Sequence, residues 1–178
     1  MCNSAVCHRC DVPFGRCWTH ANLNHATHEH LGHWFDGIHT NFLSHLSNMG
    51  AMPPHHVRSN RPVFEDLLTQ TNLKRLKGLS ICWLSGAENA VWSQQSTKSS
   101  YDLLRECFPE VNYERVIVNG YGHLDCWMGK HAHVDIFPRV ARHLAVCEEA
   151  EEGREMTVIG KGYEEDGYVN VAAEVCNG

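Results

Sequence analysis

Two short apolar segments in the middle of the chain have the pattern of buried strands. Leu79 to Leu84 is an almost continuous apolar run, and Tyr113 to Val118 ends in three β-branched residues. Runs without polar alternation are typical of strands that are covered on both faces of a parallel sheet. Between them, the spacing of apolar residues predicts a helix that is capped by Ser96 or Thr97 and ends at Pro109.

Helical spacing predicts further elements on either side of this unit. We expect helices over Asn22 to Ile38, over Asn41 to Met49, and from about His133 to Leu144. Phe64 to Leu76 is expected to hold a turn of helix, and the proline-rich residues 50–62 a loop. The order strand, helix, strand, helix predicts an α/β fold with right-handed crossovers.

The same pattern divides the chain into three parts. Residues 1–62 are expected to form a helical, cap-like segment, and residues 63–145 the α/β core. Residues 146–178 contain nine acidic and two basic residues, which gives this part a net charge of −7. Because an acidic segment without apolar periodicity is usually solvated, we expect a disordered acidic tail there.

Composition narrows the classes of protein that fit. A chain of 178 residues that is 43% hydrophobic and 20% charged is typical of a globular protein. The net charge of −6 argues against a nucleic-acid partner. No apolar run approaches the roughly 18 residues of a membrane span, and the first residues do not resemble a signal peptide. We therefore expect a cytoplasmic protein without a membrane span.

Polar and titratable residues follow both predicted strands. In α/β sheets the loops that leave the carboxyl ends of the strands carry the chemistry, and here these are Ser85 to Asn89 and Asn119 to Asp125. Two glycines in the second loop allow a tight turn that presents His123. This histidine is a candidate proton carrier, although a structural role is an equally good interpretation.

These loops resemble a known family. The sequences Gly86-Ala87-Glu88-Asn89 and Gly120-Tyr121-Gly122-His123-Leu124-Asp125-Cys126 resemble the last third of an α/β-hydrolase of the acid-lipase type. The closer resemblance is to the hydrolase-like region fused to glucose-methanol-choline (GMC) flavin oxidoreductases of the cholesterol oxidase type. It covers about residues 1–145 and includes the following stretches: Cys2 to His8, Leu23-Asn24, Thr27-His28 and Gly129 to Leu144.

The resemblance implies a fold and a set of site residues. The fold would be the C-terminal portion of an α/β-hydrolase, with its last parallel strands, flanking helices and part of a helical cap. The catalytic histidine would be His123, and the acid position would be filled by Asn89 with Glu88 beside it. The Gly-x-Ser-x-Gly elbow that holds the nucleophile is absent, and Ser4 lacks flanking glycines.

A portion without a nucleophile is expected to have little activity alone. The complete protein would act on a small-molecule ester or a sterol or lipid, as the resemblance implies. No Gly-x-Gly-x-x-Gly sequence occurs, so any FAD would belong to a missing N-terminal domain and no cofactor is expected in this chain. A sheet that lacks its inner strands would leave an exposed edge through which the chain could associate.

The concentration of cysteine and histidine near the start supports an alternative function. Ten of the fourteen histidines precede Val57. Zinc binds four Cys or His ligands in tetrahedral geometry, and a zinc-binding module could use the following set: Cys7, Cys10, His25 and His28. These histidines also fall on a helix that has apolar residues at core spacing, which favours helix-surface positions. A third possibility is a non-catalytic interaction domain.

Overall fold

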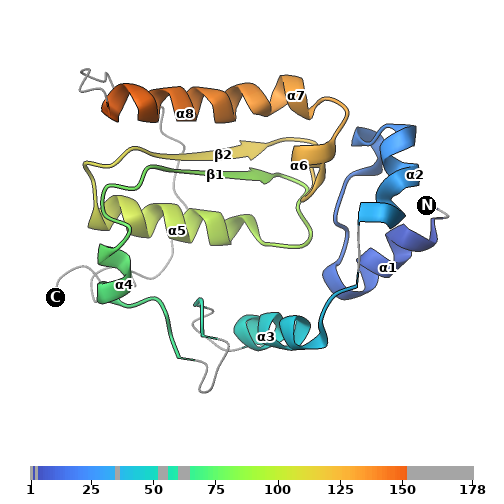
Figure 1. Ribbon diagram of the computed structural model, residues 1–178, viewed down its shortest axis with the longest axis horizontal. Coiled ribbons are helices and arrows are strands. Elements are labelled where there is room, and N and C mark those ends of the chain that lie inside the picture. The colour runs from blue at the N-terminus through green and yellow to red at the C-terminus, as the bar shows by residue number, and fades with distance from the viewer. Residues whose placement is uncertain (1, 3, 35–36, 52–55, 60–64, 152–178) are drawn as a thin grey trace.

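A two-stranded parallel sheet lies at the centre of the computed structural model, which describes residues 2, 4–34, 37–51, 56–59 and 65–151 (Figure 1). Strand β1 (Ile81–Gly86) pairs with β2 (Tyr113–Val118), with Ile81 opposite Tyr113 and Gly86 opposite Val118. The parallel pairing predicted from the sequence is confirmed. Whether this unit is part of an α/β-hydrolase fold stays a prediction.

Helices cover both faces of the sheet. Helix α5 (Gln94–Cys107) lies on one face, and α7 (Ala132–Asp135) and α8 (Phe137–Glu151) lie on the other (Figure 1). Alternate strand residues point to opposite faces. Trp83 and Tyr113 therefore pack with the α5 side, whereas Leu84 and Val118 pack with the α7 and α8 side. The continuous apolar runs of the two strands follow from this double cover.

The ends of two predicted helices differ from the sequence expectation. Helix α5 begins at Gln94 because the Ser93 side chain accepts a hydrogen bond from the Gln95 N–H, so Ser93 is the cap and not Ser96 or Thr97. Helix α8 continues to Glu151, past the predicted end at Leu144 and into the segment expected to be a tail. Residues 152–178, the rest of that segment, lie outside the described residues.

The first part of the chain forms what we call the N-terminal layer: α1 (Ala5–Phe14), the 3₁₀ turn η1 (His20–Asn22) and α2 (His25–Trp34). It lies beside α6 (Asp125–Met128), at the carboxyl ends of the strands (Figure 1). The single helix predicted from Asn22 is thus replaced by η1 and α2, because Leu23 is extended and buried between them. Helix α1 was not predicted.

The remaining elements connect the N-terminal layer to the sheet. Helix α3 (Thr40–Ala51) matches the predicted helix, and α4 (Gln70–Lys74) is the helical turn expected before β1. The predicted loop at 50–62 lies largely outside the described residues.

Among the described helices, none is long and apolar enough to cross a membrane. Within the described part of the chain each strand has one partner, so the sheet has two outer edges.

Gly86 lets the loop after β2 cross the end of β1. A Cβ at Gly86 would lie 2.1 Å from the carbonyl oxygen of Tyr121 and 2.2 Å from that of Gly122. We predict that Gly86→Ala destabilises the fold by about 1–3 kcal/mol, because backbone must move to relieve the overlap. Urea unfolding measures the change. Gly50→Ala in α3, where a Cβ meets nothing within 4 Å, is the matched control and should be neutral or slightly stabilising.

Candidate metal centre

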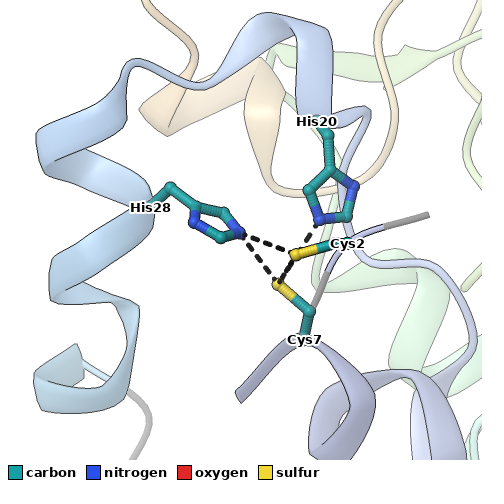
Figure 2. Close-up of side chains that lie close together, drawn as sticks. All are labelled: Cys2, Cys7, His20 and His28. Atoms are coloured by element: carbon teal, nitrogen blue, oxygen red, sulfur yellow. Dashed lines mark hydrogen bonds between the residues drawn. The ribbon is translucent and has the colours of Figure 1, made fainter. Parts of the chain in front are cut away.

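Four side chains of the N-terminal layer converge on one point. Cys2 precedes α1, Cys7 lies within it, His20 opens η1 and His28 lies in α2 (Figure 2). Their ligand atoms, two Sγ and two ring nitrogens, all lie within 4.8 Å of one another. Each ligand thus comes from a different local segment, and the turn at η1 brings His20 back toward α1.

Four of the six distances between these atoms are close to the edges of a tetrahedron around a zinc ion. The two sulfurs are 3.6 Å apart, and Nε2 of His28 lies 3.3 Å from Cys2 Sγ and 3.1 Å from Cys7 Sγ. Nε2 of His20 lies 3.4 Å from Cys7 Sγ. Zinc bonds of about 2.3 Å to sulfur and 2.0 Å to nitrogen require edges of about 3.8 Å between sulfurs and about 3.5 Å between sulfur and nitrogen. The observed edges are slightly shorter.

The pKa values of Cys7 and His20 bear on how the cluster could bind a metal ion. Burial, followed by the hydrogen bond with Cys2, raises the pKa of the Cys7 thiol to about 11. Burial and the neighbouring His28 lower the pKa of His20. Without metal, the cluster therefore holds a neutral Cys7 thiol and favours a neutral His20 imidazole. A divalent cation would favour the thiolate, which is the form that binds zinc.

A hollow that is open to solvent borders the cluster. A hollow of about 550 Å³ is lined by the following residues: Cys2, His20, Leu23, Asn24, His25 and His28. Cys7 is 1% exposed, whereas His20 is exposed. The cluster therefore has a buried thiol on one side and an accessible imidazole on the other.

Two of the four zinc ligands that the sequence predicted lie in this cluster. Cys7 and His28 belong to the cluster, but Cys10 and His25 do not. Cys10 is instead buried in the apolar core of the layer. The largely exposed His25 ring faces the Glu29 carboxylate at 3.1 Å. Cys2 and His20 take their places, and only the high local content of cysteine and histidine pointed to them.

Comparisons with protein-family models, curated proteins and solved structures find no significant match.

The other candidate site residues lie at the carboxyl ends of the strands. His123 and Asn89 are in contact, with Nδ2 of Asn89 3.2 Å from Nδ1 of His123. Glu88 is exposed, and its backbone N–H donates to the carbonyl of Tyr121. The structure thus brings together His123 and Asn89, at the same edge of the sheet.

The contact with Asn89 fixes the proton of His123. The Asn89 Oδ1 atom accepts hydrogen bonds from the backbone N–H groups of Val91 and Trp92, at 3.0 and 3.1 Å, so its NH₂ group faces the histidine. An amide donor requires an unprotonated Nδ1, which places the ring proton on Nε2. A serine hydrolase needs the opposite tautomer, because Nε2 must accept the proton of the nucleophile.

Burial strengthens the neutral state of His123. It lowers the pKa of the ring, and the nearby Asp125 carboxylate opposes this only in part. At neutral pH the side chain is therefore an uncharged imidazole that can donate from Nε2.

Asn22 joins the N-terminal layer to the His123 loop. Its Nδ2 donates to the carbonyl of Gly120 at 2.7 Å and to Oδ2 of Asp125 at 2.6 Å. The backbone carbonyl of Asn22 accepts a hydrogen bond from the backbone N–H of Lys130 at 2.7 Å. Nearby, the backbone N–H of Leu124 donates to the backbone carbonyl of Cys17 at 2.8 Å. Since Asn22 lies between His20 and His28, the segment that carries the candidate ligands also holds this loop.

Proposed function

We propose that the chain binds one zinc ion through Cys2, Cys7, His20 and His28 as a structural metal centre. The observation that carries the proposal is the convergence of two sulfurs and two imidazole nitrogens, with four of their six separations close to the edges of a zinc tetrahedron. Two thiolates and two imidazoles are a common ligand set of structural zinc sites. Four protein ligands leave no open position for a substrate, which favours a structural role over a catalytic one.

The consequence of this function is a fixed N-terminal layer. Zinc would cross-link the residues before α1 to α1, η1 and α2, and η1 contains Asn22, which binds the His123 loop. Because α1 and α2 have few buried apolar residues, namely Cys7, Cys10 and Leu31, the metal supplies stability that packing alone does not.

Zinc content tests the proposal. We expect the purified chain, desalted after loading with zinc, to lose metal from this site when Cys7 is replaced by Ser and to keep it when Cys10 is replaced by Ser. Both thiols are buried in α1, so the pair separates loss of a ligand from loss of a packed sulfur. Elemental analysis gives the stoichiometry. Equal zinc content in the two variants would contradict the assignment.

A second candidate function is the one that the sequence resemblance implies, a portion of an acid-lipase type hydrolase. The observation that favours it is the parallel pair of strands, with His123 and Asn89 in contact after them. In this proposal the nucleophile, the ester or sterol substrate, and any FAD-containing GMC domain belong to other parts of a larger protein. His123 would then need to change its tautomer when the missing parts are present.

The chain alone should not hydrolyse esters through His123. We predict that its rate on a short acyl ester equals that of His123→Ala, because His123 has no nucleophile to activate and carries its proton on Nε2. A chromogenic acyl ester assay at pH 7 measures both rates. A rate that depends on His123 would show that a serine of this chain acts as nucleophile, and Ser4→Ala would be the next variant.

A further inference from the structure

A second group of metal-ligating side chains lies on the opposite side of the sheet from α5. Cys82 in β1 and Glu114 in β2 are register partners, so both point to the face covered by α8. His143 of α8 lies over them. The Cys82 sulfur, a carboxylate oxygen of Glu114 and a ring nitrogen of His143 all lie within 4.8 Å of one another.

His143 is a buried ring that faces the Glu114 carboxylate. Its side chain is 7% exposed, and neither ring nitrogen has a hydrogen-bond partner among the residues that the structure describes. Nδ1 lies 3.5 Å from Oε2 of Glu114, close enough for an ion pair but without hydrogen-bond geometry. An unsatisfied buried polar group costs about 1–3 kcal/mol, so two bare nitrogens on a buried ring require an explanation.

Two further residues of α8, Arg142 and Cys147, lie near this group. Arg142 binds Oε1 of Glu114, which leaves Oε2 directed at His143 and fixes the carboxylate. Such hydrogen bonds orient metal ligands, although a nearby positive charge weakens the binding of a cation. Cys147 lies one helical turn after His143 in α8, so a second thiol follows His143 along that helix.

We propose that Cys82, Glu114 and His143 form a second zinc site, which is independent of the first. Sulfur, nitrogen and oxygen donors together suit zinc, and three protein ligands leave a fourth position for water or another donor. With one thiolate and with Arg142 nearby, this site binds zinc more weakly than the cluster of the N-terminal layer. It links β1, β2 and α8, three elements of the core.

Zinc stoichiometry in single and combined variants tests the proposal. We expect about two equivalents in the original chain, about one in Cys7→Ser, about one in His143→Leu, and none when both changes are combined. Leu suits the buried position and removes the bare nitrogens, so His143→Leu should fold. Glu114→Gln, which keeps the shape of the side chain, gives a second variant, and Glu110→Gln on the surface is its control.

The outcomes separate the two sites. The second site would be overturned, and the first kept, if Cys7→Ser loses zinc while His143→Leu, Cys82→Ser and Glu114→Gln keep the zinc content of the original chain. The second site would be supported, and the first overturned, if Cys7→Ser keeps the zinc content of the original chain while His143→Leu loses zinc. Cobalt substitution gives an independent readout, because its sulfur charge-transfer absorption should fall in Cys82→Ser while the spectrum of Cys10→Ser stays unchanged.

Discussion

Removing zinc should unfold the N-terminal layer while the sheet and its helices stay folded. Structural zinc sites contribute apparent binding free energies of about 10–16 kcal/mol in small peptides at pH 7, which equals or exceeds the whole stability of a typical domain. The layer has one small core of its own, whereas the sheet is covered by α5 on one face and by α7 and α8 on the other. The metal is therefore expected to decide whether the layer is ordered.

Hydrogen exchange read by mass spectrometry measures this effect. After treatment with a strong chelator, peptides from α1 and α2 should lose protection, and peptides from β1, α5 and β2 should keep it. Cys10→Ser is the control, because it should respond to the chelator as the original chain does. Protection of α1 and α2 that is unchanged by the chelator would remove the structural role assigned to the metal.

The pH dependence of stability should reverse when zinc is bound. Burial is the largest cause that raises the pKa of Cys7 from 9.0 to about 11. A raised pKa in the folded state stabilises the metal-free layer below pH 9, and this contribution is lost as the pH rises toward 11. With zinc bound, Cys7 is already a thiolate, and stability is instead lost as the pH falls, because protons compete for the ligands. Thermal unfolding of both forms across this range tests the reversal.

Asp125→Ala should be among the most destabilising single substitutions in the core. The carboxylate is fully buried and accepts hydrogen bonds from the Gly122 N–H at 2.9 Å and from Asn22 Nδ2 at 2.6 Å. The substitution leaves the buried Gly122 N–H unsatisfied and removes the charge-assisted bond from Asn22, whose amide keeps only its bond to the Gly120 carbonyl. We expect a loss of about 3–5 kcal/mol in the free energy of unfolding.

Urea unfolding of Asp125→Ala and Asp135→Ala measures the contrast. Asp135 is exposed and accepts one hydrogen bond, from the Tyr121 hydroxyl at 2.6 Å, so its removal should cost about 0.5–1.5 kcal/mol. If the two variants lose the same stability, the network around Asn22 does not hold the His123 loop in the way described.

The sheet could be predicted from the sequence because its signals are local. The apolar runs placed β1 within two residues and β2 at its observed bounds. The helix between them followed from its apolar spacing and from Pro109, although its cap is Ser93 and not the predicted Ser96 or Thr97. Helix α1 has no comparable signal, since its buried positions are two cysteines, Cys7 and Cys10, and it contains Pro13 and the exposed Val12. Their burial depends on packing against Trp18 and Leu31, which no local pattern specifies.

The sequence predicted a cluster of cysteine and histidine side chains near the start of the chain, but with only two of the members that the structure brings together. Spacing rules select ligand pairs on one helix, and they favoured Cys7 with Cys10 and His25 with His28. The structure takes one ligand from each segment instead, because the chain turns at η1. His123 and Asn89 were placed correctly at one sheet edge, since parallel strands have their carboxyl ends on the same side. The tautomer of His123 depends on amide contacts that the sequence does not encode locally.

The contacts of Asn22 also set an order of folding events. The candidate ligands are close in sequence, with Cys2 and His28 separated by 26 positions, whereas Asn22 reaches Gly120 and Asp125 across 98 and 103 positions. Closing a long loop costs more conformational entropy and slows folding. We therefore expect the ligand cluster and the β1–α5–β2 unit to form separately, each from nearby residues. The docking of one on the other, through Asn22, is then the last and slowest step.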